Sequence, residues 1–313
     1  MTWKLTNPET EIVMTTLPLP EIGHRSYYLI SSANRVLLGN KITEFVCDRL
    51  VELTLLEDNG KELLFHIEHH RHVTKGTALI HYYNDELCDV YSNMRMAVGY
   101  DGAVRGITDF DNVRTRWQLK RAEILREYSS DVEPLVEGTS QLLEDKEKFV
   151  HSLFGGYGFW RFFFQPWYHR EYEGLERNEL LLRNYFGEVD LPLNVESDIA
   201  PREDENGLVK SIVSKATLAG RAFDRPAFSR MLKNLTKVYN IEARLNVDFE
   251  ESYAFLKNGT LANAELFLNS SVSNWYTVTT GHKLIQITAR GLEVLKTAED
   301  MVETLEMNEP NTE

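Results

Sequence analysis

The chain has 313 residues, enough for two ordinary domains or one large β-rich domain. Apolar residues make up 42% and charged residues 26%, which is typical of soluble globular proteins and excludes disorder or low complexity for most of the chain. The formal net charge of −14 argues against a general nucleic-acid-binding protein, because phosphate neutralisation requires a cationic surface. The acidity is local, since residues 188–205 and 291–313 each carry a net charge of −6 and the rest is nearly neutral.

The cysteine content and the N-terminal residues bear on the compartment. Cys47 and Cys88 are the only cysteines, and neither belongs to a CxxC pair, which excludes a zinc ribbon or a thioredoxin-like site. We expect two reduced, partly buried thiols. The N-terminal residues lack a basic start followed by an apolar run, and no stretch reaches the roughly 18 apolar residues of a membrane span. These features predict a cytoplasmic protein without a transmembrane segment.

Four Asn-Gly or Asp-Gly dipeptides predict tight hairpins, because these residues tolerate the positive φ angles of a type I′ turn. They lie at residues 59–60, 101–102, 206–207 and 258–259. The flanking segments are rich in apolar and β-branched residues, and residues 241–249 alternate apolar with polar side chains, as a half-buried strand does. In chain order, strands are predicted at residues 26–30, 42–56, 63–73, 94–100, 104–108, 208–218, 239–255, 261–272 and 284–288.

Four amphipathic helices are predicted between these hairpins. Their approximate ranges are 111–128, 140–154, 225–239 and 292–305. Asp111 and Asp224 are candidate N-caps, and Pro226 suits the first turn of the third helix because its missing N–H costs little there.

Long strands joined by tight hairpins predict an α+β protein with a large curved antiparallel sheet and a few amphipathic helices packed on one side. The absence of a βαβ pattern and of a Gly-rich βα turn disfavours a Rossmann or TIM architecture. Residues 1–170 and 171–306 are expected to form two sheet-plus-helix halves or one continuous domain, followed by a disordered tail at 307–313. In outline, such a half-open sheet resembles lipoprotein-carrier folds, an analogy of architecture that identifies no family and sets no function.

Residues 154–168 are unusually aromatic, with nine aromatic side chains among 15 residues. Each aromatic ring buries a large apolar area, so this segment must be hidden or must bind something. It can fill the core between helices and sheet, form a ligand pocket or a docking surface, or dip into a membrane. The candidate ligand or partner residues are Tyr157, Phe159, Trp160, Phe162, Phe164 and Trp167.

Residues 65–72 form a histidine-rich strand, Phe-His-Ile-Glu-His-His-Arg-His. On a regular strand, alternate residues share a face, so His66, Glu68, His70 and His72 are expected to point the same way. Imidazoles near a carboxylate can bind a divalent metal, which makes His66, His70 and His72 candidate ligands. The alternatives are a solvated strand face, which needs no cofactor, and a pH-sensitive surface.

Two predicted helices carry basic side chains on their polar faces, which suggests a contact with an acidic partner or simply a solvated surface. The candidate partner face consists of Arg114, Arg121, Arg230 and Lys233. No nucleophile elbow, P-loop or dinucleotide-binding motif occurs in the sequence.

Three functions remain open from the sequence. The first is a non-enzymatic binding or assembly protein that acts through protein–protein contacts. The second is a carrier of an apolar small molecule in a cavity between sheet and helices, lined by the aromatic segment. The third is a metal-dependent enzyme that uses the histidine-rich strand.

Overall fold

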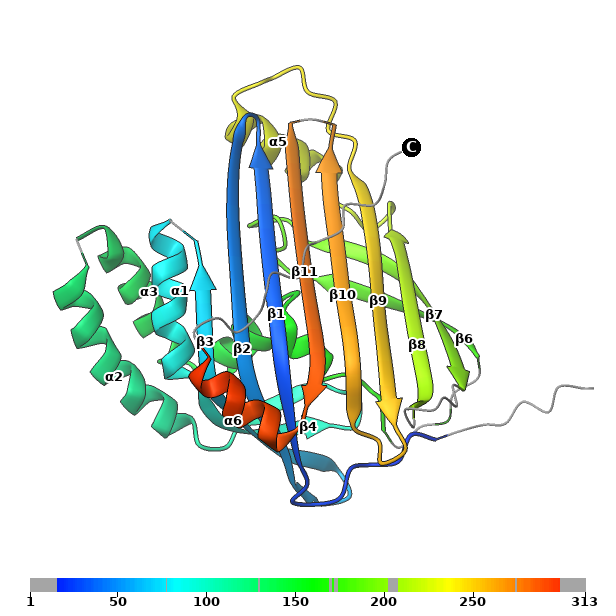
Figure 1. Cartoon of the computed structure of the whole chain (residues 1–313). Coiled ribbons are helices and arrows are strands. Elements are labelled where there is room, and N and C mark those ends of the chain that lie inside the picture. The colour runs from blue at the N-terminus through cyan, green and yellow to red at the C-terminus, as the bar shows by residue number, and fades with distance from the viewer. Residues whose placement is uncertain are drawn as a thin grey trace, which may run out of the picture.

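A computed structural model of the chain describes residues 16–298 apart from 77, 129, 169–170, 172–173, 202–207 and 274. The described residues form one sheet of eleven strands, six α-helices and two short 3₁₀ helices (Figure 1). The strands are β1 (Arg25–Leu38), β2 (Lys41–Asp58), β3 (Glu62–Lys75), β4 (Asn93–Gly99), β5 (Val104–Ile107), β6 (Leu175–Leu182), β7 (Leu191–Pro201), β8 (Leu208–Leu218), β9 (Asn246–Leu256), β10 (Leu261–Val272) and β11 (Tyr276–Ile287). The α-helices are α1 (Leu79–Val90), α2 (Phe110–Glu127), α3 (Glu133–Leu142), α4 (Lys146–Phe154), α5 (Arg225–Thr236) and α6 (Ala289–Thr297), and the 3₁₀ helices are η1 (Ser130–Val132) and η2 (Phe159–Phe162).

The strands are antiparallel throughout, and their order across the sheet is β5-β4-β3-β2-β1-β11-β10-β9-β8-β7-β6. The first and last strands therefore pair in the middle, and β5 and β6 form the two edges. Each half of the chain runs through three strands, then one helix, then the remaining strands, with α1 after β3 and α5 after β8. Strands from both halves of the chain, β1 to β5 and β6 to β11, belong to this one sheet. The segment that contains α2, α3, α4 and the aromatic residues connects its two edges.

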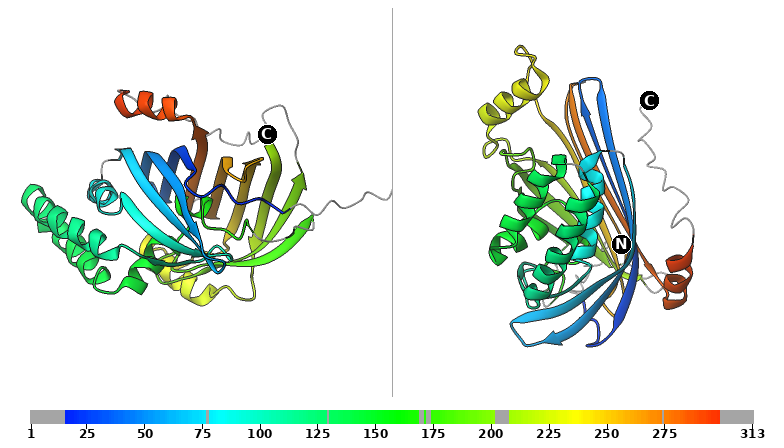
Figure 2. Two further views of the ribbon diagram at one scale, coloured as in Figure 1. Left: turned by 90° about the horizontal axis from the view of Figure 1, so that it is seen from below. Right: turned by 90° about the vertical axis from the view of Figure 1, so that its left-hand side faces the viewer.

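The sheet is curved, and its two faces are covered unequally (Figure 2). On β1, Tyr28 and Ile30 belong to the large hydrophobic cluster of the concave face, whereas Tyr27 and Leu29 pack near Leu292 of α6 on the opposite face. This alternation is the period-two pattern of a strand buried on both sides. Helices α1 to α5 and η2 lie over the concave face, and α6 alone lies over the convex face (Figure 2).

Two hydrophobic clusters fill the concave face. The larger one lies beneath α1 to α4 and the aromatic segment, with Trp117, Ile124 and Phe149 among its helical members. The smaller one lies beneath α5, where Phe228 and Leu232 pack against β9, β10 and β11. The apolar stripe of each amphipathic helix thus points to the sheet, as its sequence spacing predicts.

The predicted fold class is confirmed: the protein is α+β and is built on a large curved antiparallel sheet. The placement of all helices on one side holds for α1 to α5, and α6 is the exception. No helix among the described ranges is long and apolar enough to cross a lipid bilayer.

Three of the four predicted hairpin turns are present between paired strands. Gly60, Gly102 and Gly259 adopt positive φ angles of 80°, 77° and 79°, which glycine tolerates best. The predicted type I′ geometry is wrong, because the Asn or Asp residue before each of these glycines does not have a positive φ. The turn at residues 206–207 lies outside the described residues, although β7 and β8 pair on either side of it. The predicted tail at 307–313 and the end of the fourth helix also lie outside them.

The predicted helix at 140–154 is wrong in its extent, because the chain breaks there into α3 and α4. The carboxylate of Asp145 accepts hydrogen bonds from the backbone N–H groups of Glu147 and Lys148, both at 3.1 Å, and so starts a new helix. The third predicted helix ends earlier than expected, because Lys237 adopts a left-handed conformation at its C-terminus. Helix α1 and strands β6 and β7 were not predicted.

Candidate functional site

The aromatic segment lies along the concave face and fills it. Phe159, Trp160, Phe162 and Trp167 are buried, and Tyr157 and Phe164 are half-buried. Trp167 packs against Tyr253 of β9, with ring centroids 4.6 Å apart. Of the alternatives open from the sequence, the core position describes most of this segment, because these rings contact the sheet and not solvent.

Arg161, the one charged residue in the middle of this segment, is bound to the sheet. Its guanidinium donates hydrogen bonds to both carboxylate oxygens of Glu251 on β9, and the Nη2–Oε2 distance is 3.2 Å. The Tyr253 hydroxyl donates to the same carboxylate at 3.2 Å. Burial lowers the pKa of Arg161, but the adjacent carboxylate outweighs this effect and raises it, so the guanidinium stays charged.

A groove of about 630 Å³, here called the edge groove, opens beside the aromatic segment where the two edges of the sheet face each other. One wall is β5 with the turn before it, the other is the end of β6, and α4 crosses between them. The rings of Phe154, Trp160 and Phe164 form its aromatic side. Its remaining lining residues are Gly102, Ala103, Val104, Arg105, Gly106, Lys146, Glu147, Val150, His151, Gly155, Gly156, Arg161, Leu180, Leu181 and Leu182.

The charged groups of the edge groove are mostly cationic. Arg105 donates to Asp101 at 2.6 Å, and Arg161 is committed to Glu251. Lys146 lies against Gly106 of β5, where a glycine leaves room for the aliphatic part of the lysine. Lys146 makes no ion pair with any residue in the described ranges, so its ammonium group is available to an anion. Glu147 is the acidic group of the lining.

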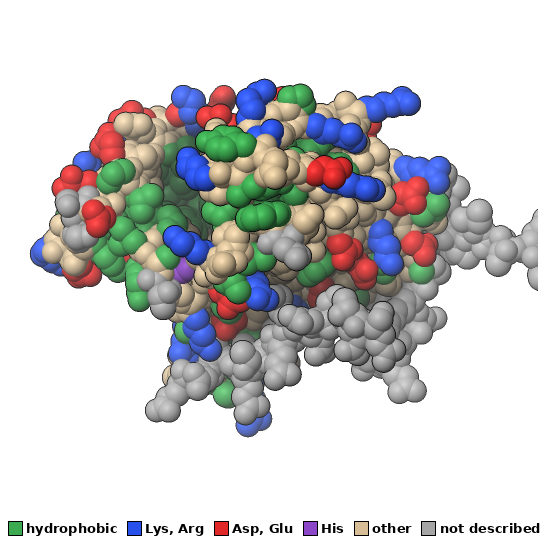
Figure 3. Space-filling model, turned by 90° about the horizontal axis from the view of Figure 1, so that it is seen from above, with side chains coloured by type: hydrophobic (Ala, Val, Ile, Leu, Met, Phe, Trp, Pro, Cys, Tyr) green, Lys and Arg blue, Asp and Glu red, His purple; other side chains and the backbone are tan. Residues whose placement is uncertain are grey.

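A second groove of about 600 Å³ lies at the end of the molecule that carries α5. Its walls are Met231 and Leu235 of α5, the turn at residues 185–189 and Tyr276. Viewed from this end, apolar side chains gather around a hollow with Lys and Arg side chains at its rim (Figure 3). Arg230 lines this second groove, and Lys233 is half-buried on the same helix.

The four predicted basic partner residues do not form one surface. Arg114 and Arg121 are exposed on α2, at the outer side of the helical layer, whereas Arg230 and Lys233 lie on α5 at the end of the sheet (Figure 1). Two other basic residues of α2 are half-buried and bind neighbouring elements. Lys120 pairs with Glu86 of α1 at 3.0 Å, and Arg116 donates to the carbonyl groups of Val90 and Asn93.

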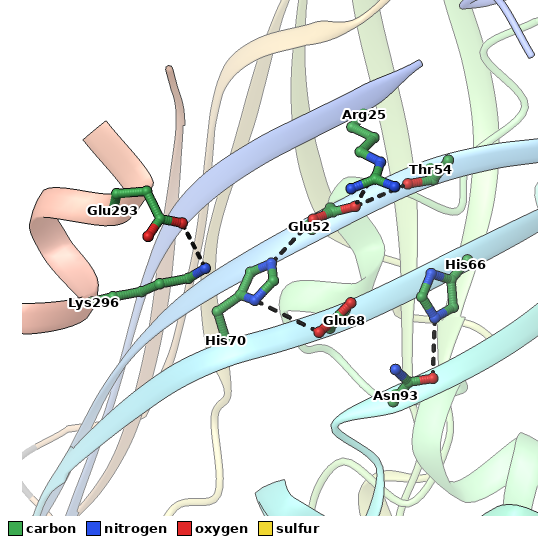
Figure 4. Close-up of polar contacts among 9 residues, drawn as sticks. All are labelled: Arg25, Glu52, Thr54, His66, Glu68, His70, Asn93, Glu293 and Lys296. Carbon is green, nitrogen blue, oxygen red and sulfur yellow. Dashed lines mark hydrogen bonds and ion pairs between the residues drawn. The ribbon is translucent and has the colours of Figure 1, made fainter. Parts of the chain in front are cut away.

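The histidine-rich strand is β3, and the structure separates its histidines. His70 lies on the convex face between two carboxylates, with Nε2 3.1 Å from Glu52 and Nδ1 3.7 Å from Glu68 (Figure 4). His66 contacts the side-chain oxygen of Asn93 at 3.0 Å. The expectation that His72 shares this face is wrong, because a β-bulge between the Leu50 and Val51 pairings shifts the register of β3.

His72 instead points towards α1, where its Nε2 lies 3.4 Å from Asp85. The three predicted metal ligands therefore do not converge. Within the described residues, the donor groups that do converge are those of Glu52, Glu68 and His70, all within 4.8 Å of one another. Carboxylate and imidazole donors suit a divalent cation, but the Arg25 guanidinium lies 3.5 Å from Glu52 and competes for that carboxylate. The arrangement is that of an ion-pair network.

Sequence reasoning missed the edge groove. Its walls come from three segments far apart in the chain, and Lys146, Val150 and Leu180 carry no local signal that would single them out. Only the high aromatic content of residues 154–168 indicated this region. Of the candidate ligand residues predicted from it, Trp160 and Phe164 line the groove.

Comparison with known proteins adds no family, because no protein-family model and no curated protein matches the chain. Among solved structures, a DUF1329 family protein from Desulfovibrio piger shares 8% sequence identity, covering 85% of this chain and 87% of its own, with a TM-score of 0.19. An outer membrane lipoprotein-sorting protein domain from Vibrio parahaemolyticus shares 9% identity, covering 86% and 91%, with a TM-score of 0.16. Both TM-scores are too low to establish a shared fold, so the properties of these proteins are not transferred to this chain.

Proposed function

We propose that the protein is a non-enzymatic binding protein for a small amphiphile with an apolar body and an anionic head group, held in the edge groove. The observation that carries this proposal is the groove of about 630 Å³, which has an aromatic and aliphatic lining and contains Lys146, a lysine without an ion-pair partner among the described residues. Pockets for small ligands commonly measure about 300–1,000 Å³ and combine a mostly apolar lining with a few placed polar groups. The edge groove falls within this range of volumes, and its lining combines aromatic and aliphatic side chains with several charged ones.

The lining supports binding of the apolar body. Phe154 and Phe164 are half-buried and stand nearly perpendicular, with centroids 5.6 Å apart, so part of each ring remains open to the groove. Leu180 and Leu182 of β6 face them from the opposite edge of the sheet. An apolar chain placed between these walls would remove both its own surface and that of the rings from water, which contributes about 25 cal/mol per Å².

The charges support an anionic head group. Lys146 is the cation that no described carboxylate neutralises, and Arg105 and His151 lie in the same lining. The overall negative charge of the chain does not oppose this binding, because most of it belongs to two local segments.

The test compares two lysines in the first turn of α4. Lys146→Glu reverses the charge inside the groove, and Lys148→Glu makes the same change on an exposed lysine outside the lining. The probes are palmitate and its uncharged methyl ester, measured by displacement of a fluorescent fatty acid and by native mass spectrometry. We expect Lys146→Glu to weaken palmitate binding at least about tenfold, as the loss of a charge-assisted contact predicts, with little effect on the ester. Equal effects of both variants, or no binding to the wild type, would contradict the proposal.

A second pair of variants tests the site by adding a bulky side chain inside or outside the groove. A side chain added at Gly156, which lines the edge groove, meets open space, and one added at Gly158, which is not part of the lining, meets equally open space. Gly156→Phe is expected to block both probes, and Gly158→Phe to leave binding unchanged. Binding that survives Gly156→Phe would place the ligand elsewhere, for example in the second groove beside α5.

Binding to a protein partner, the other non-enzymatic function predicted from the sequence, has weaker support. The basic residues that suggested it lie on separate helices and form no common face. For this reason we favour the small amphiphile.

A further inference from the structure

Segments that are distant in the sequence meet at one end of the molecule, here called the α5 end. The Gly39 N–H donates to the carbonyl oxygen of Trp275 at 2.8 Å, which joins the turn between β1 and β2 to the start of β11. Tyr185 and Tyr276 line the second groove together with residues of α5. The α5 end consists of residues 38–42, 183–190, 219–245 and 275–276, and it shares no residue with the lining of the edge groove.

Four large apolar side chains are exposed at the α5 end. The exposed fraction is 53% for Ile42, 48% for Leu235, 73% for Tyr239 and 43% for Trp275. Leu235 lines the second groove with Tyr276, which directly follows Trp275, so these side chains belong to one surface. An apolar surface bordered by polar groups is typical of an interaction site.

The α5 end also carries an excess of positive charge. Residues 219–245 contain six basic and two acidic side chains, a net charge of +4 in a chain whose net charge is −14. One of the two acids, Asp224, accepts a hydrogen bond from the Ala227 N–H at 2.9 Å and so caps α5. No carboxylate in the described ranges forms an ion pair with the basic side chains of this end, which are Lys41, Arg183, Arg221, Arg225, Arg230, Lys233, Lys237 and Arg244.

Helix α5 holds this surface in a fixed position. Phe228 and Leu232 are fully buried in the smaller hydrophobic cluster, so the other side of the helix is presented outwards. The loop between α5 and β9 rises above the ends of the strands (Figure 1). Helix α6, where the acidic C-terminal segment begins, lies at the opposite ends of the strands (Figure 1). The cationic end is therefore separate from this acidic segment.

We propose that the α5 end docks on the surface of a membrane that contains anionic lipids. Trp275 and Tyr239 each combine an apolar ring with a polar tip, which suits the head-group region of a bilayer. Ile42 and Leu235 supply the aliphatic contact with the acyl boundary. The unpaired cations attract the anionic head groups, and salt screens this attraction.

The mixture of cations and apolar groups favours a lipid surface over an acidic protein. The centres of protein–protein interfaces are depleted in charged residues. At the α5 end, by contrast, Lys and Arg side chains stand among the exposed apolar ones (Figure 3). An anionic membrane carries negative charge throughout its plane, so cations from separate segments can each meet a head group without matched geometry.

The first experiment measures lipid selectivity with the full-length protein. Vesicles of phosphatidylcholine alone, and vesicles of phosphatidylcholine and phosphatidylserine in a two-to-one ratio, are sedimented with the protein at increasing salt concentration. We expect binding to the anionic vesicles to be at least about tenfold tighter and to weaken as salt increases. Equal binding to both vesicles, or binding to neither, would overturn the proposal.

Charge reversal locates the docking surface. The double variant Arg230→Glu with Lys237→Glu should weaken binding to the anionic vesicles at least about tenfold. The matched control is Arg114→Glu with Arg121→Glu, which makes the same change in net charge at two exposed positions of α2. The control should bind as the wild type does. Equal losses in the two double variants would show that only net charge matters, and would overturn the assignment to the α5 end.

Tryptophan fluorescence tests whether the apolar side chains enter the bilayer. Lipids with brominated acyl chains should quench the wild-type protein, and Trp275→Phe should remove this quenching. Leu235→Ser with Tyr239→Ser should weaken vesicle binding at least about tenfold, whereas Leu119→Ser, at a 67% exposed position of α2, should not. Quenching that persists in Trp275→Phe would contradict the proposal.

Light scattering without lipid tests a different occupant of this surface, a second copy of the chain. We expect the wild type and the variant Leu235→Ser with Tyr239→Ser to have the same mass in solution. A wild-type dimer that this variant abolishes would assign the α5 end to self-association and overturn the proposal. The vesicle measurements use no fatty acid and no residue of the edge groove, so this proposal and amphiphile binding can fail separately.

Discussion

Arg161 and Glu251 join the aromatic segment to β9, an interior strand of the sheet, through a buried bidentate ion pair. On β9, Glu251 lies between Phe249 of the smaller hydrophobic cluster and Tyr253 of the larger one. The ion pair therefore marks the boundary between the two clusters of the concave face. Because a buried carboxylate is stable only when paired, the pair fixes where along β9 the aromatic segment can lie.

Removing one partner of this pair should destabilise the protein strongly. Arg161→Met leaves the Glu251 carboxylate buried without a counter-ion, and we expect a loss of about 3–5 kcal/mol in the free energy of unfolding. The double variant Arg161→Met with Glu251→Leu removes both charges and should recover most of that loss. Urea denaturation measures both changes.

A surface pair serves as the control for that prediction. Lys283 and Glu265 lie 2.7 Å apart on neighbouring strands but are largely exposed, so Glu265→Gln should cost less than about 1 kcal/mol. If Arg161→Met cost no more than Glu265→Gln, the ion pair would not anchor the segment.

The protein should lose stability below neutral pH because of two shielded histidines. Burial, together with the nearby Arg49 charge, lowers the pKa of His69 and of His282 to about 3, whereas the unfolded chain binds these protons near pH 6.5. Between these values the unfolded state binds more protons, so stability is full above pH 6.5 and falls as the pH decreases. Each ring contributes a slope of roughly 1.4 kcal/mol per pH unit.

The pH slope can be assigned by substitution. His69 stacks on Trp160, with centroids 5.7 Å apart, so His69→Phe keeps a ring there and removes the titration. Urea midpoints between pH 5 and 7 should then show a slope smaller by about one proton, whereas His151→Gln at an exposed position should match the wild type. An unchanged slope in His69→Phe would show that other groups cause the acid sensitivity.

The fold class was predictable because its signals are local. Asn258-Gly259 defines a hairpin within one short segment, and β8 and β10 have the predicted bounds. The strand predicted at 239–255 is wrong at its start, because β9 begins at Asn246 and most of the alternation at 241–249 precedes it. Strand β7 was missed because it lies inside the acidic segment, whose charged residues mask the period-two pattern, and β6 was missed with it because charged residues also interrupt its apolar positions. The break between α3 and α4 depends on one cap, Asp145, inside an otherwise continuous helical pattern.

The candidate sites were less predictable because they depend on contacts between distant segments. Strand periodicity placed His72 beside His70, and a single bulge reversed its direction. A local pattern therefore identified the aromatic segment, but not the groove beside it.

Two turn glycines should differ in their tolerance of a side chain. Gly60 and Gly259 have nearly the same positive φ, but a Cβ at Gly60 meets open space, whereas one at Gly259 would lie 1.8 Å from the Pro18 carbonyl oxygen. Gly60→Ala should cost only the strain of the left-handed conformation, about 1–2 kcal/mol. Gly259→Ala should cost about 1–3 kcal/mol more, because the segment at Pro18 must move. Equal unfolding free energies for the two variants would show that Pro18 does not press on this turn.

Helix α6 on the convex face should depend on Arg71 of β3. The Arg71 guanidinium donates to the carbonyl oxygens of Leu295 at 2.8 Å and Ala298 at 2.6 Å, which closes the C-terminal end of α6. Arg71→Met removes these charge-assisted hydrogen bonds, so hydrogen-exchange protection of the α6 amides should fall about 10- to 100-fold. Global stability should change little, because α6 buries only Leu292 against the sheet. Lys215→Met on the exposed side of β8 is the matched control, and equal exchange from α6 in both variants would contradict the assignment.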